Sequence, residues 1–416
     1  ATPRRAISRT LTTSSPWCAA SSPMPDHVPM TRPDPSQPMT VLDLIRRTAS
    51  RYADKPAVIC RQETVTYARL LQRMTDCQPL PVPLLGATWE SDFTLHTTGS
   101  TGAPKAIVVT QEAVIANTEN LIAAHGYKPE TVFILTGPND HLGCWSKIFA
   151  VLATGGTLVM TDGLRSIDSF YAAIDSTEGP VATFLVPAAI HTLLHYSAPR
   201  LASCAPRIDF IETGAAPMPH ADKLLLCRLL PAARLYMTYA STETGIIATY
   251  NFNDGECIPG CVGTAMPRSS FAITPEGKIA CSGDTLCKEW QGRTFVTNDN
   301  GHTDSIGRLY IDGRQDDTIN VGGYKVSPAE VEDVAMSLPD IADCICIAVP
   351  HPVTGHALKL LVQLAPGCAT LDKRRIARHI NTSLERWKVP MLYEAVTSIA
   401  RTHNGKLDRK AYRTQP

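Results

Sequence analysis

The chain has 416 residues, 44% of them hydrophobic, and its 39 lysines and arginines are balanced by 39 aspartates and glutamates. This length supports two or three domains, or one large α/β unit with a small appendage. The balanced charge gives no electrostatic reason to expect nucleic acid or an anionic membrane as the main partner. The longest apolar stretch, residues 148–160, is too short and too rich in glycine and threonine to cross a bilayer, so no membrane span is predicted.

The 13 cysteines are scattered along the chain, and nowhere do two of them have the Cys-x2-Cys spacing that zinc sites favour. Cys344 and Cys346 alternate with apolar residues, which places both thiols on one face of a buried strand. An odd number of cysteines without a secretory signal indicates a reducing compartment. We therefore predict structural thiols in a cytoplasmic protein.

Residues 1–38 have the composition of a disordered tail. They hold eight prolines, four arginines and two acids, and they show no hydrophobic periodicity. The folded part is predicted to open just afterwards, with an amphipathic helix whose apolar positions include Val41, Leu44 and Ile45.

Short apolar runs then alternate with helix-like segments, an order that predicts a largely parallel α/β sheet. The strand-like runs are residues 57–60, 106–110, 132–136, 157–161, 182–186, 207–213 and 234–239. Clear helices are predicted at residues 111–125 and 220–230.

The texture of the sequence changes twice after this alternating part. From about residue 250, turns rich in glycine and aspartate indicate a small β-rich subdomain. From residue 313, a strand, helix, strand order indicates a compact α+β domain. The predicted domains are a disordered tail at 1–38, a large α/β domain at 39–312 and a small α+β domain at 313–416.

Residues 97–105, with the sequence TTGSTGAPK, lie between two predicted strands and have the composition of a phosphate-binding loop. The two glycines let the backbone approach a ligand, the hydroxyl residues offer hydrogen-bond donors, and Lys105 supplies a positive charge. The spacing differs from that of a Walker A loop, and no helix follows the lysine directly, which excludes an ordinary P-loop ATPase.

Three later segments also carry polar residues suited to a nucleotide. Tyr239 and Glu243 lie at the end of a predicted strand, where open α/β sheets bind ligands and where a carboxylate can hold Mg²⁺. Asp299 and Arg314 are suited to grip ribose hydroxyls. The last segment, NGKLDR at residues 404–409, lies close to the chain end.

As an ordered set, these segments resemble the adenylate-forming superfamily, which includes acyl- and aryl-CoA synthetases, nonribosomal-peptide adenylation domains and luciferases. The matching segments are TTGSTGAPK, YASTETG, FVTND, GRQDDTINVGGYKVSPAEVE and NGKLDRK. The resemblance extends from about residue 41 to residue 413. It implies a large AMP-binding domain followed by a small mobile domain.

The resemblance implies an ATP-dependent enzyme that needs Mg²⁺. The residues implied to contact ATP are Thr98, Gly99, Ser100, Thr101, Gly102, Lys105, Gly214, Ala215, Ala216, Tyr239, Asp299 and Arg314. Within this set Tyr239 would stack on adenine, and Asp299 and Arg314 would hold the ribose. Thr242 and Glu243 would hold the α-phosphate and the metal ion.

The implied reaction activates a carboxylic acid to an acyl-adenylate, with release of pyrophosphate, and then transfers the acyl group to a thiol. CoA is the favoured acceptor. Lys406 is implied to bridge the carboxylate and the α-phosphate, which are both anionic and need a cationic partner in the transition state.

The resemblance also implies that the small domain swings about a hinge at Asp316 between the two half-reactions. The movement would remove Lys406 from the site and bring in a loop for thiol attack. The residues of this loop are Gly322, Gly323, Tyr324 and Lys325.

His141 indicates the substrate class. It falls where many acyl- and aryl-CoA synthetases carry a histidine, which favours a non-amino carboxylic acid with His141 in a catalytic role. The amino-acid-activating branch instead places an aspartate near this point, and Asp140 is adjacent, so that alternative stays open.

The chain departs from the superfamily pattern in three places. Only 26 residues, 71–96, stand where the family has a long α/β stretch, so the N-terminal subdomain is shortened. The shortening is expected to expose an apolar sheet face, which a partner subunit or a homo-oligomer would cover. Ala240 and Asn298 replace glycines of the family motifs, and Ala240 adds a methyl group beside the expected adenine.

Two alternatives to a CoA ligase follow from the same resemblance. One is a stand-alone adenylating enzyme that loads the phosphopantetheine arm of an acyl carrier protein. The other is a truncated relative that binds nucleotide without turnover. The presence of Lys105, Glu243, Asp299, Arg314 and Lys406 favours an enzyme.

Overall fold

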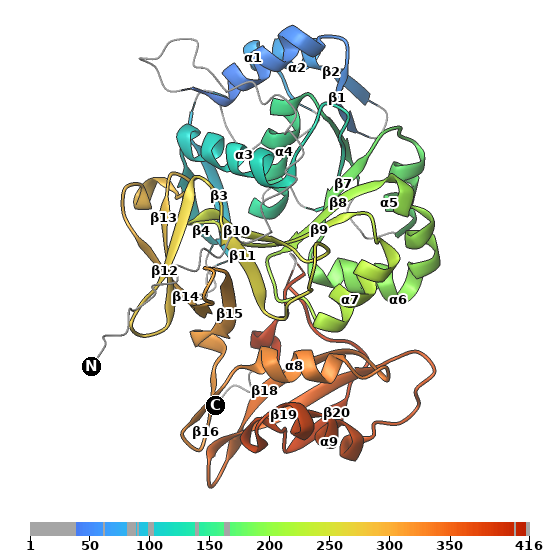
Figure 1. Cartoon of the computed structure of the whole chain (residues 1–416), viewed down its shortest axis with the longest axis vertical. Coiled ribbons are helices and arrows are strands. Elements are labelled where there is room, and N and C mark those ends of the chain that lie inside the picture. Colours follow the sequence, from blue (N-terminus) through green and yellow to red (C-terminus); the bar gives the residue numbers. More distant parts are fainter. Residues whose placement is uncertain are drawn as a thin grey trace, which may run out of the picture. The chain divides into compact units, whose positions relative to one another are not determined.

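The computed structural model of the chain describes residues 39–60, 63–80, 89, 91–98, 104–137, 141–161, 167–402 and 405–412. Figure 1 shows the elements in chain order. The predicted tail at residues 1–38 lies outside the described residues.

The helices follow one another as α1 (Val41–Tyr52), α2 (Tyr67–Thr75), α3 (Gln111–His125), α4 (Leu142–Thr154), α5 (Ile167–Asp175), α6 (Pro187–Ser203), α7 (His220–Leu229), α8 (Pro328–Met336) and α9 (Lys373–Ser383). The strands up to residue 251 are β1 (Pro56–Cys60), β2 (Glu63–Thr66), β3 (Phe93–Thr98), β4 (Pro104–Val109), β5 (Val132–Leu135), β6 (Thr157–Met160), β7 (Val181–Phe184), β8 (Ile208–Gly214), β9 (Arg234–Ser241) and β10 (Gly245–Asn251). The later strands are β11 (Cys261–Ala265), β12 (Ser269–Ile273), β13 (Lys278–Gly283), β14 (Phe295–Thr303), β15 (Leu309–Arg314), β16 (Ile319–Val321), β17 (Tyr324–Val326), β18 (Ile341–His351), β19 (Gly355–Leu364) and β20 (Leu392–Ala395).

The first helix begins where the apolar pattern predicts it. Thr40 precedes α1, and its hydroxyl accepts a hydrogen bond from the backbone N–H of Asp43 at 3.2 Å. The Asp43 carboxylate accepts from the backbone N–H of Thr40 at 3.0 Å, which completes a capping box. Val41, Leu44 and Ile45 are buried, as predicted.

The main sheet has 13 strands in the order β12-β13-β14-β15-β11-β10-β9-β8-β7-β5-β6-β1-β2. The part formed by β1, β6, β5, β7, β8 and β9 is parallel, which confirms the predicted α/β sheet. From β9 onward the pairing is antiparallel. The predicted β-rich part after residue 250 is formed by the antiparallel strands that continue this sheet.

One predicted strand of the main sheet lies elsewhere. The run at residues 106–110 belongs to β4, which pairs only with β3 in a separate antiparallel hairpin. The short connection between β3 and β4 favours a local hairpin over a crossover into the parallel sheet.

Helices cover both faces of the parallel part of the sheet. Ile211 and Leu235 point to one face and join a core with α5, α6 and α7. Phe210 and Tyr236, at neighbouring positions, point to the other face and pack against His125 of α3. Figure 1 shows α3 and α4 on a different side of the strands from α5, α6 and α7.

The apolar sheet face expected to be exposed is covered in the described residues. Phe93 of β3 packs against Trp145 and Phe149 of α4. The β3–β4 hairpin therefore covers this helix from solvent. The large hydrophobic side chains of the described parallel strands are buried or partly buried. The structure therefore gives no reason for self-association on this face.

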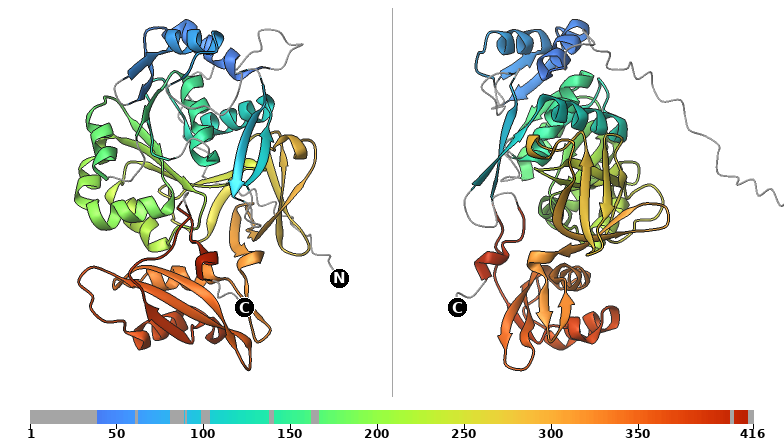
Figure 2. Two further views of the ribbon diagram at one scale, coloured as in Figure 1. Left: turned by 180° about the vertical axis from the view of Figure 1, so that it is seen from behind. Right: turned by 90° about the vertical axis from the view of Figure 1, so that its left-hand side faces the viewer.

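The C-terminal domain contains a three-stranded sheet, in which β18 and β19 are antiparallel and β20 joins β19 in parallel. Cys344 and Cys346 of β18 pack with Val331 of α8 and Ile380 of α9, whereas Ile345 joins a different cluster. Both thiols therefore lie on one buried face, as predicted. Figure 2 shows this domain, in orange and red, from two further sides.

Every cysteine among the described residues is a free thiol. None of the described helices combines the length and the apolar character that a membrane crossing requires.

Candidate active site

Tyr239 of β9 and Asp299 of β14 are in direct contact. The tyrosine hydroxyl donates a hydrogen bond to Asp299 Oδ2 at 2.7 Å. Burial, together with the charge of Asp299, raises the pKa of Tyr239 well above its ordinary value, so the phenol stays neutral and remains a donor. The structure thus brings together two of the residues predicted to contact the nucleotide.

Arg314 joins this pair through the register of two neighbouring strands. Asp299 on β14 lies opposite Arg314 on β15, and Arg314 Nε is 3.5 Å from Asp299 Oδ1. The predicted hinge residue Asp316 lies 3.9 Å from Arg314 Nη2, and it accepts a hydrogen bond from Asn298 at 3.3 Å. The asparagine that departs from the family motif therefore contacts the start of the C-terminal domain.

Thr242 and Glu243 lie in the tight turn between β9 and β10. The turn is closed by reciprocal hydrogen bonds between Ser241 and Thr244, each from a backbone N–H to the other side-chain oxygen at 3.2 Å. The backbone N–H of Cys287 donates to the carbonyl of Glu243 at 2.8 Å. These bonds fix the backbone from which the Glu243 carboxylate projects.

The turn after β8 carries Gly214, Ala215 and Ala216. A Cβ atom at Gly214 would lie 2.7 Å from the carbonyl oxygen of Thr238, so only glycine fits beside β9. Ala215 has a φ of 68°, in the left-handed region that costs a non-glycine residue about 1–2 kcal/mol. Such strain is typical of turns that contact ligands, which agrees with the predicted place of these residues.

The predicted phosphate loop connects β3 and β4. Thr98 lies opposite Pro104 at the end of the hairpin, which places the loop at its tip. Lys105 is exposed, and its ammonium lies 3.7 Å from the carboxylate of Glu289. The other predicted loop residues, Gly99, Ser100, Thr101 and Gly102, lie outside the described residues.

Lys406 of the C-terminal domain lies close to the residues from β9, β14 and β15. Burial and the neighbouring Arg314 lower the pKa of Lys406, whereas the charges of Asp299 and Glu243 act in the opposite direction. These interactions place one ammonium, one guanidinium and two carboxylates in a single site. Four of the predicted site residues, one from each of the last four motifs, are therefore brought together.

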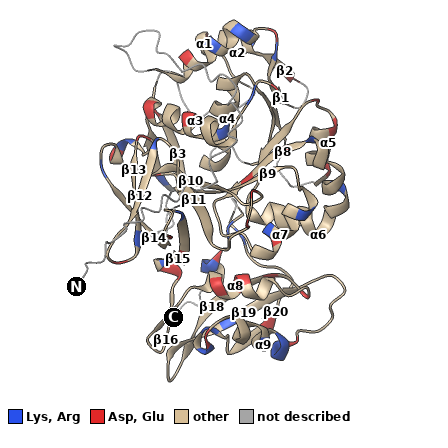
Figure 3. Ribbon diagram, in the orientation of Figure 1, with Lys and Arg blue, Asp and Glu red and all other residues tan. Residues whose placement is uncertain are grey.

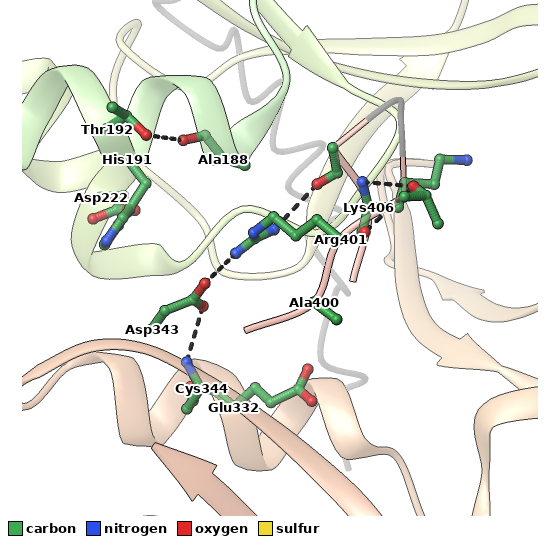
Figure 4. Close-up of polar contacts among 12 residues, drawn as sticks. Ala188, His191, Thr192, Asp222, Glu332, Asp343, Cys344, Ala400, Arg401 and Lys406 are labelled. Atoms are coloured by element: carbon green, nitrogen blue, oxygen red, sulfur yellow. Dashed lines mark hydrogen bonds and ion pairs between the residues drawn. The ribbon is translucent and has the colours of Figure 1, made fainter. Parts of the chain in front are cut away.

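The segment around Lys406 is held by contacts both before and after the lysine. Figure 4 shows the contacts of Arg401, which precedes it in the chain. Arg401 bonds Asp343 of β18 at 2.6 Å and the carbonyl oxygen of Gly405 at 3.1 Å. After the lysine, Arg409 makes two hydrogen bonds to the carboxylate of Glu332 on α8, at 2.6 and 2.8 Å. Paired guanidinium and carboxylate groups of this kind fix orientation as well as position.

The Lys406 turn also contacts the large domain. A Cβ atom at Gly405 would lie 3.1 Å from Cγ2 of Val186, the residue that precedes α6. Within the turn, the backbone N–H of Thr402 donates to the carbonyl of Lys406 at 2.8 Å. The lysine is therefore presented from a closed turn that packs against the end of β7.

His141 caps the start of α4. Its Nδ1 accepts a hydrogen bond from the backbone N–H of Gly143 at 3.2 Å. A Cβ atom at Gly143 would lie 2.6 Å from the ring of Phe184, so the start of this helix lies against the end of β7. Asp140, on which the amino-acid alternative depends, lies outside the described residues.

The predicted thiol-transfer loop forms a hairpin within the C-terminal domain. Gly322 and Gly323 have φ values of 60° and 95°, and they form the two-residue turn between β16 and β17. Gly322 donates its backbone N–H to the carbonyl of Thr354, and the ring of Tyr324 stacks on Trp387. Lys325 is exposed. Among the described residues, this hairpin therefore contacts its own domain through Thr354 and Trp387.

A buried ionic cluster links α3, α4 and β8, and the sequence motifs did not reveal it. Lys147 of α4 bonds Glu212 of β8 at 2.7 Å, and their side chains are only 1% and 0% exposed. Nδ1 of His125 lies 3.4 Å from the other oxygen of Glu212. The Lys147 ammonium also lies 5.4 Å from the centre of the Phe184 ring. The signal in the sequence was the lone charge of Lys147 within the apolar segment of α4, since a buried charge needs a partner.

The sequence model of the AMP-binding enzyme family matches residues 90–282. The model of the AMP-binding enzyme C-terminal domain matches residues 330–406. The two matches together cover more than half of the chain and contain most of the residues described above.

Among known proteins, the chain is 27% identical over 369 residues to an indoleacetate–CoA ligase from Aromatoleum aromaticum, covering 83% of this chain and 71% of that ligase. It is 24% identical over 388 residues to a mitochondrial malonate–CoA ligase from Homo sapiens, covering 80% and 67%. Among solved structures, the o-succinylbenzoate CoA synthetase from Bacillus subtilis in complex with an acyl-adenylate has a TM-score of 0.75 at 17% identity. That match covers 90% of this chain and 98% of the other, and it shows a shared fold.

Proposed function

Since the chain belongs to the adenylate-forming superfamily of AMP-binding enzymes, we propose that it is an ATP-dependent ligase that joins a carboxylic acid to the thiol of CoA. The acid and ATP first give an acyl-adenylate and pyrophosphate. The thiol then displaces AMP and forms a thioester. The similarity to an indoleacetate–CoA ligase and to a malonate–CoA ligase supports this type of reaction.

The observation that carries the proposal is the position of Lys406. The lysine comes from the C-terminal domain, yet its pKa responds to Arg314, Asp299 and Glu243 of the nucleotide-site segments. A lysine near the chain end is ordinarily solvated. Its placement among these groups is what adenylate formation requires.

The chemistry explains why a cation is needed at this point. A carboxylate oxygen of the acid attacks the α-phosphorus, a new P–O bond forms, and the bond to the bridging oxygen of pyrophosphate breaks. Both reactants are anionic, so the approach is opposed until a positive group lies between them. Lys406 supplies that charge. Burial and Arg314 lower the pKa of Lys406, and the carboxylates of Asp299 and Glu243 oppose this shift.

The remaining contacts position the nucleotide. Asp299 and Arg314 would hold the ribose, and Tyr239 would lie beside the adenine while its hydroxyl keeps Asp299 in place. The strained turn at Ala215 would flank the adenine and the acyl group. Lys105 would reach the β- and γ-phosphates from the tip of the β3–β4 hairpin.

The donor set also fits Mg²⁺, which prefers carboxylate oxygen and shares phosphate oxygens with the protein. Glu243 and Thr242 would hold the ion on the rigid turn after β9. When bound, the ion supplies charge neutralisation at the phosphates.

The substrate is proposed to be a carboxylic acid without an α-amino group. His141 stands at the start of α4 beside Phe184, at the end of the sheet where Lys406 is presented.

The test is to incubate the chain with ATP, Mg²⁺ and single acids from aryl, short-chain, long-chain and amino-acid classes, and to identify products by mass spectrometry. We expect one non-amino class to give an acyl-adenylate, which becomes an acyl-CoA when CoA is added. ATP binding without an acyl-adenylate from any class would instead identify a non-catalytic relative.

A specific surface favours a carrier protein as a second candidate acceptor. Tyr324 and Trp387 are stacked and exposed, and Met391 and Leu392 follow them as exposed apolar side chains of the same domain. Exposed basic residues lie along α9, as Figure 3 shows. An apolar and basic surface of this kind suits an acidic protein partner.

The two acceptors can be separated by one variant. Trp387→Ala is expected to leave the rate with CoA within about twofold if CoA is the acceptor. If a phosphopantetheinylated carrier protein is the acceptor, transfer to that protein should exceed transfer to CoA in the wild type and should fall at least tenfold in Trp387→Ala.

A further inference from the structure

Two histidines and one aspartate converge outside the proposed active site. His191 and His195 lie one turn apart on α6, and their ring centres are 4.0 Å apart. Asp222 lies in the first turn of α7. One of its oxygens is 2.8 Å from Nδ1 of His191, and the other is 3.5 Å from Nε2 of His195. Both imidazoles are therefore directed at one carboxylate.

The spacing of these donor atoms suits a small divalent cation. All three donors lie within 4.8 Å of one another. Donor atoms of a tetrahedral zinc site with bonds of about 2.1 Å lie about 3.4 Å apart, so a separation of 4.8 Å must close by about 1.4 Å. His195 can make this adjustment, because its side chain is 42% exposed while His191 and Asp222 are 15% and 6% exposed.

We propose that His191, His195 and Asp222 bind a divalent transition-metal ion of the zinc class. Two histidines four residues apart on one helix face form a recurrent zinc-binding pair, and a carboxylate from a second helix completes three protein ligands. The exposed side of His195 leaves room for water as the fourth ligand. Imidazole nitrogen favours zinc, cobalt or nickel over Mg²⁺ and Ca²⁺.

The surroundings of His191 support the site. The backbone of Ala342 and the carboxylate of Asp343, both on β18, lie near enough to His191 to act on its charge. Histidines that bind metals usually donate their second N–H to such a partner, which fixes the ring. Figure 4 shows His191 and Asp222 in the large domain, and Asp343, bonded to Arg401, in the C-terminal domain.

The simpler explanation is a hydrogen-bonded aspartate without a metal. In that case one imidazole would satisfy the carboxylate, as His302 does for Asp312 at 2.9 Å elsewhere in the chain. Here a second imidazole lies beside the first, and it is directed at the same carboxylate. One dication satisfies both nitrogens and the carboxylate at once.

The experiment measures binding of Zn²⁺ and Co²⁺ to the full chain after chelator treatment, without ATP or acid. It is therefore independent of the proposed ligase function. Calorimetry is expected to show one Zn²⁺ per chain, and Co²⁺ should give visible d–d absorption without a thiolate charge-transfer band. His195→Gln and Asp222→Asn should each weaken binding at least tenfold.

His302→Gln is the matched control, because it removes an exposed histidine paired with a single carboxylate. It should bind Zn²⁺ as the wild type does. His195→Gln should keep the thermal midpoint of the metal-free chain, since the side chain is 42% exposed. Zn²⁺ should raise the midpoint of the wild type and of His302→Gln but not that of His195→Gln. Any one of three results would overturn the proposal. They are a wild type that does not bind one Zn²⁺ per chain, a His195→Gln variant with unchanged affinity, and a thiolate charge-transfer band with Co²⁺.

Discussion

The hydroxyl of Tyr239 reaches Asp299 at 2.7 Å, although β10, β11 and β15 separate their strands in the sheet. The antiparallel half of the sheet therefore curls back toward the end of β9. Register then adds Arg314 opposite Asp299. Three residues of the proposed nucleotide site are thus brought together, two by strand pairing and the third by a side-chain hydrogen bond.

Tyr239→Phe is predicted to weaken ATP binding. The change removes the hydroxyl that donates to Asp299 and leaves a partly buried carboxylate short of one partner. A hydrogen bond to a charged group contributes roughly 1.5–3 kcal/mol, so we expect KM for ATP to rise about tenfold or more. Tyr310→Phe is the control, because that hydroxyl bonds Asp304 at 3.1 Å outside the site. Equal ATP affinities in wild type and Tyr239→Phe would contradict the role of the pair.

Lys406→Ala is predicted to separate the two half-reactions. Adenylate formation should fall at least about a hundredfold, because the charge between the two anions is lost. Thioester formation from a preformed acyl-adenylate and CoA should remain within a few-fold of wild type. Single-turnover assays of each step provide the measurement, with the exposed Lys410→Ala as control. Equal loss of both steps would show that the lysine has a structural or shared role.

Arg401→Gln is predicted to slow adenylate formation about tenfold without raising KM for ATP. Arg401 holds the carbonyl of Gly405 and the carboxylate of Asp343, so its loss releases the turn that presents Lys406. Small displacements of a positioned group have large effects on rate. Thioester formation should be unaffected, which a general loss of stability would not allow. Arg375→Gln, which removes an exposed ion pair with Asp340, serves as control.

Glu212→Gln is predicted to destabilise the chain by about 3–5 kcal/mol at pH 7, because it leaves the buried Lys147 ammonium without its partner. Adding Lys147→Met should restore much of the loss. Asp92→Asn, which breaks an exposed pair with Lys288, should change the free energy of unfolding little. Urea unfolding monitored by circular dichroism gives these values.

The same pair predicts a pH dependence. Burial alone would raise the pKa of Glu212, but the charges of Lys147 and His125 outweigh it and lower the pKa to about 2. A carboxyl group with a lowered pKa stabilises the fold fully above its ordinary pKa of about 4.5 and loses that contribution as pH falls toward 2. The difference between wild type and Glu212→Gln should therefore shrink below pH 4.5. A constant difference from pH 7 to pH 3 would contradict this account.

Local patterns in the sequence were sufficient to predict the type and place of most helices and strands. Helix α3 has the predicted bounds, because an N-cap at Thr110 and a glycine at its end mark both termini. The parallel strands were recognisable as short apolar runs bounded by turns. The ordered motifs indicated Tyr239, Asp299 and Lys406, which the structure brings near one another.

Other features depend on contacts between distant parts of the chain. Lys147 and Glu212 are 65 residues apart, and neither side chain indicates its partner by local pattern. Whether β4 joins the parallel sheet or pairs locally is decided by competition between strands. The same holds for the antiparallel extension beyond β9. The hairpin at Gly322 was recognisable as a turn, but its contact with Thr354 was not.

ATP–pyrophosphate exchange measures whether Lys406 completes a site for adenylate formation. The assay would use the panel of aryl, short-chain, long-chain and amino acids, with wild type and Lys406→Ala side by side. We predict exchange that depends on one class of non-amino acid and is lost in Lys406→Ala. Exchange that persists in Lys406→Ala would contradict this role of the lysine. A wild type that binds ATP but shows no exchange with any acid would contradict it as well.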